Sequence, residues 1–282
     1  MSKITTYLQE RFPLATVAPM SLATAVMLMG AGAHLGVSGH YLWVTIVLGL
    51  SFVAFLLRTR ITDEFKDARH DDANYPNRPV QRGVITRKQL LPMGIGALTL
   101  ELATVALAAA LSGSIAFAIW YLPVLAFSAL TAVEFFAGSW LEKHFNTYFL
   151  SHQLIFVFFS LWGAALVAAM PLPIEWLGYL GFILYMAALE VVRKFEVRYD
   201  AAGQAVPDTY ITVWGRNRSI AVLAVTQIAA GLAFAISSST PLPLVVSLVA
   251  VAALVLVRKS DDKVRASVGL AFFFQAAVVF LT

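Results

Sequence analysis

Residues 40 to 71 read HYLWVTIVLGLSFVAFLLRTRITDEFKDARHD, and no other stretch of the chain says as much about its fold. Its first part is an almost wholly apolar run, long enough to cross a bilayer at about 20 residues per transmembrane helix. The run leads into DEFKDARHD, in which Asp63, Asp67 and Asp71 follow one another at four-residue intervals. The sequence therefore predicts a transmembrane helix that carries a row of carboxylates at its end.

The rest of the chain has the same membrane character. Of its 282 residues 60% are hydrophobic and 13% charged, and the mean hydropathy is +0.78. We expect an all-α polytopic membrane protein, residues 1 to 282 forming one domain, with a polar cytoplasmic cap. The nine expected transmembrane helices are residues 14–36, 40–57, 90–111, 114–133, 149–170, 174–190, 219–237, 241–257 and 266–281. The chain has no cysteine, which excludes disulfides and thiolate metal sites.

The basic residues predict how the chain is oriented. All 20 Lys and Arg residues lie in the N-terminal segment, in residues 58 to 89, at Lys143, in residues 191 to 218 or in residues 258 to 265. By the positive-inside rule these segments are cytoplasmic, and the C-terminus lies across the membrane. We expect a prokaryotic inner membrane, and we read the net charge of +4 as a mark of orientation and not of nucleic-acid binding.

The acidic row predicts a site for a cation. Four residues of a helix turn about 40° beyond a full turn, so the three aspartates are expected on one face, with Glu64 beside Asp63. The negative charges of carboxylates on such a face repel one another. At the mouth of a membrane bundle a divalent cation is the natural means of neutralising it.

The chain continues from residue 72 to residue 85 as DANYPNRPVQRGVI, in which Arg78 and Arg82 flank a turn. Mg²⁺ prefers one or two carboxylates together with phosphate oxygens, and arginine binds phosphate in bidentate fashion. Acids and arginines together therefore indicate a diphosphate carried on magnesium. The alternative is a salt-bridged helix end in water, for which Lys66 and Arg69 supply partners.

The second long loop opens with EVVRKFEVRYD at residues 190 to 200. One interpretation makes Glu190 a second metal ligand, with Arg193 and Lys194 on the phosphates. The other makes the two cations an anchor that flanks a membrane span. Further on, Asp208 is expected to cap a short helix.

Two charged residues in other connections and spans are open to two interpretations each. Lys143 either binds phosphate or only orients its neighbouring helices. Glu101 lies well inside a predicted span, where acids are costly. It either makes a structural hydrogen bond or takes part in an active-site cavity or in ion coupling.

With both loops in view, the chain resembles the UbiA superfamily of intramembrane prenyltransferases. The first motif of that family is written NDxxDxxxD, and Asp63, Glu64, Asp67 and Asp71 stand at its four positions. The RPxxxG turn that follows it is matched by Arg78, Pro79 and Gly83. The resemblance covers nearly the whole chain.

The resemblance implies a site divided between the two loops. Its metal ligands for Mg²⁺ would be Asp63, Glu64, Asp67, Asp71 and Glu190. Its diphosphate-binding residues would be Arg78, Arg82, Lys143, Arg193 and Lys194. The second motif, usually DxxxD, departs from the family pattern because Lys194 stands at its second acid. A protonated lysine is no metal ligand, so either Glu196 or Asp200 replaces that acid, or Lys194 touches the diphosphate directly.

The implied function is transfer of a prenyl group. An allylic isoprenyl diphosphate would enter from the lipid bilayer, with its tail in a central apolar cavity of the bundle and its head at the two loops. It would ionise there, with Asp63, Asp67, Asp71 and Glu190 as catalytic residues. A lipophilic acceptor, commonly an aromatic ring, would then attack the cation; in a UbiA-type terpene cyclase the double bond of the substrate itself attacks. Outside enzymes, the same features would suit a transporter or a non-catalytic isoprenoid-binding protein. A CDP-alcohol phosphotransferase would need a DGxxAR start, which this chain does not have.

Overall fold

A computed structural model describes residues 2–32, 39–165 and 175–282 of the chain. The described residues are almost entirely helical and contain no β-sheet, only an isolated antiparallel bridge between Tyr199 and Ala205. The helices before the middle of the chain are α1 (Lys3–Arg11), α2 (Leu14–Gly32), α3 (Gly39–Lys66), α4 (Ala68–Asn74), α5 (Arg87–Ser112), α6 (Ile115–Ile119), α7 (Leu122–Ala132), η1 (Glu134–Phe136) and α8 (Gly138–Leu141). The remaining helices are α9 (Phe145–Gln153), α10 (Ile155–Ala164), α11 (Glu175–Arg193), α12 (Tyr210–Trp214), α13 (Arg216–Ser238), α14 (Leu242–Val257) and α15 (Asp261–Leu281).

The all-helical membrane fold is confirmed, but the count of nine spans is not. Among the described residues, 7 helical segments are long and apolar enough to cross a membrane, one of them formed by α6 and α7 together (Ile115–Ala132). α14 is a shorter apolar helix. The fifth expected span, residues 149 to 170, is divided at Leu154 into α9 and α10, and its last part lies outside the described residues. No proline or glycine stands at this break, so no local residue signals it.

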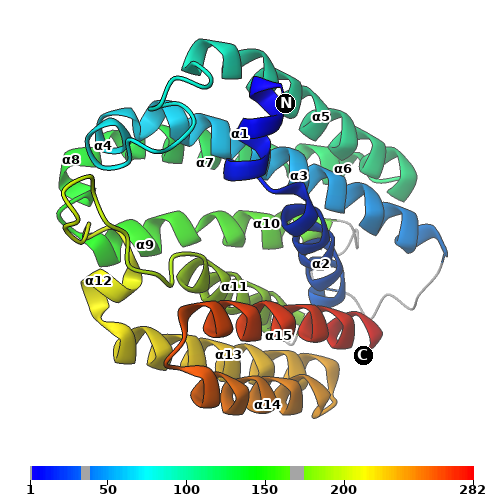
Figure 1. Cartoon of the computed structure of the whole chain (residues 1–282). Helices are drawn as coiled ribbons and strands as arrows, with labels where there is room; N and C mark the ends of the chain where they lie inside the picture. The colour runs from blue at the N-terminus through cyan, green and yellow to red at the C-terminus, as the bar shows by residue number, and fades with distance from the viewer. Residues whose placement is uncertain (1, 33–38, 166–174) are drawn as a thin grey trace.

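The helices pack into a bundle whose polar segments lie together. α2 packs against α3, α11 and α15, and α3 packs against α5 while α11 packs against α13. Figure 1 shows α4, α8 and α12 gathered at one end of the bundle, on the left, with the C-terminus at the opposite end. The two loops predicted to form the site therefore lie on one side, as expected. Which side is cytoplasmic stays a prediction.

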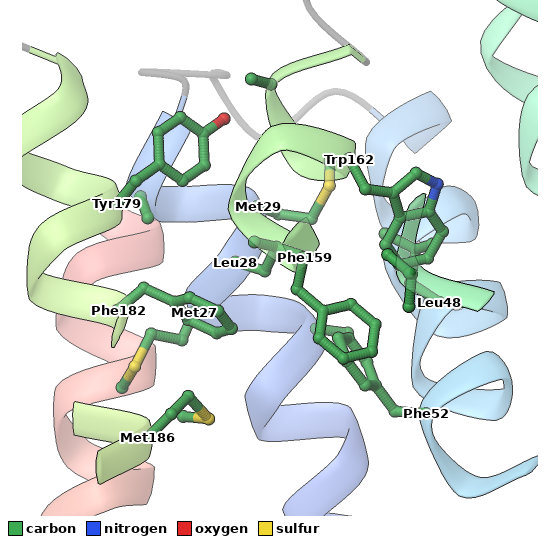
Figure 2. Close-up of a cluster of buried hydrophobic side chains, with 14 of the residues drawn as sticks. Met27, Leu28, Met29, Leu48, Phe52, Phe159, Trp162, Tyr179, Phe182 and Met186 are labelled. Carbon is green, nitrogen blue, oxygen red and sulfur yellow. The ribbon is translucent and has the colours of Figure 1, made fainter. Parts of the chain in front are cut away.

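Aromatic side chains fill the centre of the bundle. Phe52 of α3 packs against Phe159 and Trp162 of α10, with ring centroids 4.9 and 6.2 Å away. Figure 2 shows these rings beside Phe182 and Met186 of α11. Because aromatic side chains bury a large apolar area, they hold α3, α10 and α11 together beneath the polar end. The central apolar cavity expected for a prenyl chain stays a prediction.

The one acid inside a span has a structural partner. Glu101 of α5 is fully buried and accepts two hydrogen bonds from Arg58 of α3, at 2.7 and 2.9 Å. The Tyr121 hydroxyl donates a third, at 2.7 Å. A buried carboxylate with this many donors is satisfied within the protein, so the structural interpretation of Glu101 is the one its contacts support.

Candidate active site

The first motif contains a break in the helix. α3 ends at Lys66 and α4 begins at Ala68, and Asp67 between them has φ −88° and ψ 13°. The four acids of the motif separate into two pairs that face different neighbours. One pair is Glu64 with Asp71, and the other is Asp63 with Asp67.

Glu64 and Asp71 face α1 and are held by arginines; we call them the arginine-held pair. Glu64 is only 1% exposed, and its Oε1 accepts hydrogen bonds from Arg11 Nε at 3.1 Å and Arg60 Nη2 at 3.3 Å. Asp71 forms an ion pair with Arg78, and Arg11 lies 4.0 Å from it. These charges are neutralised by guanidinium groups that stay protonated at any working pH.

Asp63 and Asp67 share a lysine. Lys66 Nζ lies 3.2 Å from Asp67 Oδ1, 3.9 Å from Asp63 Oδ1 and 3.6 Å from Glu134 Oε1. It also donates to the Tyr148 hydroxyl at 3.1 Å. We call these five residues the Lys66 group. Lys66 thus forms the ion pairs expected of a salt-bridged helix end, but its side chain is only 9% exposed and does not lie in bulk water.

The expectation of a single acidic face was wrong in part. On an ideal helix Asp67 lies about 40° from Asp63, whereas Asp71 and Glu64 lie about 80° and 100° from it. Helix geometry alone therefore groups Asp71 with Glu64. The break in the helix at Asp67 increases the separation between the two pairs. Arg11 and Arg78 then hold the arginine-held pair against α1.

Glu134 reaches the Lys66 group from an unusual turn. Glu134, Phe135 and Phe136 all have positive φ, at 49°, 54° and 58°. This left-handed conformation costs an ordinary residue about 1–2 kcal/mol. Gly138 leaves the space that the carboxylate needs, because a Cβ there would lie 2.1 Å from Glu134 Oε2. Sequence reasoning missed Glu134, since tertiary packing and not local propensity imposes such a turn.

The second motif reaches the same tyrosine. Glu190 at the end of α11 accepts two hydrogen bonds from Arg193, both at 2.8 Å, and lies 3.9 Å from Lys194. Lys194 Nζ is 5.9 Å from the ring centroid of Tyr148, and Lys66 Nζ is 5.6 Å from it. The two motifs, predicted from opposite halves of the chain, therefore meet at Tyr148.

The acids suggested as replacements for Lys194 are engaged elsewhere. Glu196 accepts from Arg198 at 2.7 Å and from Arg265 at 3.0 Å. Asp200 accepts two backbone N–H groups, from Ala202 and Gln204, and closes a turn. Their contacts leave Lys194 as the residue of this motif that faces Tyr148.

The predicted phosphate-binding cations are dispersed. Arg78 pairs with Asp71 and stacks over Tyr75, 3.8 Å from the ring centroid. Arg82 pairs with Glu10 of α1 at 2.5 Å, and Lys143 is exposed in the turn between α8 and α9. Gly83 has φ 77°, which explains the glycine of the RPxxxG turn. Of the five predicted cations, Lys194 lies against the Tyr148 ring of the Lys66 group, and Arg193 is bound to Glu190 next to Lys194.

Asp208 joins the two loops, a role that sequence reasoning missed. It accepts a hydrogen bond from the Tyr75 hydroxyl at 2.5 Å, and Arg198 and His70 lie 3.4 and 3.7 Å away. Burial by itself would raise the pKa of Asp208, but the His70 imidazole and the Tyr75 hydroxyl lower it to about 2. The expected cap of α12 is Thr209 instead, one residue further on.

Two of the five predicted metal ligands have surroundings that fit a divalent cation. Asp63 and Asp67 already converge on one positive charge, and their side chains are 30% and 36% exposed. Glu64, Asp71 and Glu190 are held by guanidinium groups, so their contacts give no support to a ligand role. Within the described residues, no three His, Cys, Asp or Glu side chains are arranged to hold a metal ion.

Among known proteins, solved structures share the fold of this chain. No protein-family model matches the sequence, and no curated protein matches it either. A solved structure of digeranylgeranylglyceryl phosphate synthase is similar over 100% of this chain and 98% of its own, with a TM-score of 0.53 and 15% identity. The apo structure of a UbiA homolog from Aeropyrum pernix K1 is similar over 95% of this chain and 94% of its own, with a TM-score of 0.56 and 15% identity. This multi-pass membrane chain therefore has the fold of the UbiA-type prenyltransferases.

Proposed function

We propose that this protein is a UbiA-type intramembrane prenyltransferase that uses Mg²⁺ to ionise an allylic isoprenyl diphosphate and passes the prenyl group to a lipophilic acceptor. Similarity to two structures of that fold over nearly the whole chain supports the general activity. The observation that carries the proposal is the meeting of both motifs at Tyr148, where Lys66 and Lys194 lie within 6 Å of one ring.

The acidic and the basic residues of the site would have different roles. Asp63 and Asp67 would hold the metal ion, which supplies positive charge to the leaving diphosphate. Lys194 and Arg193 would contact the phosphate oxygens and stabilise the negative charge that develops as the C–O bond breaks. Tyr148 would fix the position of both lysines. The arginine-held pair and Asp208 would keep the two loops in place without touching substrate.

The interior beneath the site would hold the prenyl chain. Phe52, Phe55 and Phe159 form a row of rings between α3 and α10, with centroid distances of 4.9 and 5.0 Å to Phe159. An apolar interior of this kind keeps water from the allylic cation, which water would otherwise trap. The ring faces would also stabilise a nearby cation.

A single incubation tests prenyl transfer against cyclisation. Purified protein is mixed with C10 to C20 allylic diphosphates and Mg²⁺, with and without a lipophilic aromatic acceptor, and released pyrophosphate and extracted products are measured. We expect pyrophosphate and prenylated acceptor only when the acceptor is present. Cyclic hydrocarbons without acceptor would replace the transferase by a terpene cyclase. Pyrophosphate release in neither arm would contradict an enzyme of either kind and leave a transporter or binding protein.

A further inference from the structure

The Lys66 ammonium occupies the centre of the proposed metal site. Its side chain is 9% exposed, and Asp63, Asp67 and Glu134 lie within 4.0 Å of the nitrogen. A lysine ammonium donates three hydrogen bonds and accepts none. With three carboxylates and the Tyr148 hydroxyl around it, Lys66 has more acceptors than it needs. The carboxylates thus already surround a cation that is part of the chain.

This cation is exchangeable in a way that the arginines nearby are not. A guanidinium is planar and binds a carboxylate through a fixed fork, as Arg193 does with Glu190. An ammonium is a compact charge on a flexible four-carbon stem, and its distances here, 3.2 to 3.9 Å, include long ones. Among the cations that pair with the acids of the first motif, Lys66 is therefore the one whose geometry fixes its partners least.

We infer that Lys66 is a resident cation that competes with divalent metal for Asp63, Asp67 and Glu134. The substrate-free protein then binds the metal weakly and takes it up together with the diphosphate. This inference rests on the proposed function. The diphosphate would make the exchange favourable because its oxygens could bind the metal and also accept hydrogen bonds from the displaced Lys66 ammonium, and Lys194 lies near the same Tyr148 ring.

The inference also assigns a ligand that neither motif contains. Glu134 comes from η1, and its left-handed backbone and the space left by Gly138 aim its carboxylate at the Lys66 nitrogen. The three carboxylates are not arranged to hold a metal ion while Lys66 lies among them. With Lys66 displaced, they would have to move together to share one divalent charge. Charge count at a carboxylate site changes metal affinity over several orders of magnitude. Glu134 should therefore add to the affinity of the opened site.

Manganese binding tests the inference without any turnover. Free Mn²⁺ is measured by electron paramagnetic resonance during titration of the whole chain in detergent. Without diphosphate, the Lys66→Met variant should bind Mn²⁺ about 10- to 100-fold more tightly than the wild type. Lys66→Arg keeps a cation in place, and a less exchangeable one, so it should bind Mn²⁺ at least as weakly as the wild type. Lys88→Met, which removes an exposed lysine of the same polar end, is the matched control and should also match the wild type.

Two further arms identify where the metal goes. Adding Glu134→Gln to Lys66→Met should remove most of the gained affinity. Adding inorganic pyrophosphate to the wild type should raise its retention of Mn²⁺ in equilibrium dialysis at least about tenfold, because metal and diphosphate enter together. This wild-type arm does not depend on the folding of any variant.

The outcomes separate this inference from the proposed function. Equal Mn²⁺ affinity of wild type and Lys66→Met without pyrophosphate overturns the inference, as does full affinity in the double variant. A wild type that gains no Mn²⁺ with pyrophosphate also overturns it. Failure of prenyl transfer in the incubation with allylic diphosphates contradicts the proposed function instead, since Mn²⁺ binding needs no acceptor and no turnover.

Discussion

The two acid pairs of the first motif come from one stretch of nine residues and have opposite surroundings. Glu64 and Asp71 are buried and held by Arg11, Arg60 and Arg78, while Asp63 and Asp67 are partly exposed and share Lys66. Permanent guanidinium partners fix a structure, whereas a flexible ammonium leaves its carboxylates open to exchange. The family motif here thus combines a structural pair with a chemical pair, and substitutions should separate the two.

The largest effect should come from the chemical pair. Asp67→Asn removes one of the two carboxylates that fit the metal, so we expect kcat/KM to fall by about a thousandfold, equivalent to about 4 kcal/mol of transition-state stabilisation. Membrane insertion and thermal unfolding should be unchanged, because Asp67 is partly exposed and contacts a single cation. Pyrophosphate release in detergent measures the rate.

Asp72→Asn is the matched control for this substitution. Asp72 lies on the short helix α4 that begins directly after Asp67, is 53% exposed and pairs with Arg87 outside the Lys66 group. An exposed ion pair of this kind contributes about 0–1 kcal/mol, so this variant should keep its activity. Near-normal turnover of Asp67→Asn would exclude the chemical role of the pair.

The structural pair should give a smaller effect of a different kind. Glu64→Gln leaves Arg11 and Arg60 without their shared carboxylate in a buried place, which should cost about 3 kcal/mol of unfolding free energy. Thermal unfolding in detergent measures the loss. At temperatures where the variant is folded, its turnover should stay within a few-fold of the wild type. A stable variant without turnover would instead make Glu64 a metal ligand, as the family motif implies.

More of the fold than of the site could be predicted from the sequence. Apolar runs and the placement of Lys and Arg were enough for the bundle and its polar end, because both reflect solvation of whole segments. The interruption of the fifth expected span at Leu154 has no proline or glycine beside it, so no local residue signals it. The same holds for Glu134, because the left-handed turn at residues 134 to 136 contains no glycine that would signal it.

Within the site, the sequence showed which residues take part but not how they pair. Lys66 was visible as a partner for the acids, and Lys194 as a departure from the second motif. That both approach Tyr148 depends on α9 lying between α3 and α11, which no spacing within either loop encodes. Helix geometry alone predicts that Glu64 and Asp71 lie on a different side of the helix from Asp63. Counting only the four-residue intervals between the aspartates missed this, because each interval adds a further rotation of about 40°.

A smaller effect should come from the second motif. Lys194→Ala should weaken binding of pyrophosphate by about tenfold, because a charged hydrogen bond to phosphate contributes about 1.5 kcal/mol. Binding of Mn²⁺ alone should change less, since Lys194 contacts Glu190 and the Tyr148 ring and not Asp63 or Asp67. Calorimetric titration with each ligand separates the two constants. If metal binding tightens while pyrophosphate binding holds, Lys194 only repels the metal.

The smallest effect should come from the contact that joins the loops. Tyr75→Phe removes the hydrogen bond to Asp208 but keeps the ring that stacks on Arg78, so about 1 kcal/mol of unfolding free energy should be lost. Arg198 still lies beside Asp208, which limits the cost. Because Tyr75 and Asp208 hold the loops and touch neither lysine of the site, KM for the diphosphate should rise more than kcat falls. A loss of kcat as large as that of Asp67→Asn would show that this loop contact belongs to the chemistry and would erase the distinction between the two pairs.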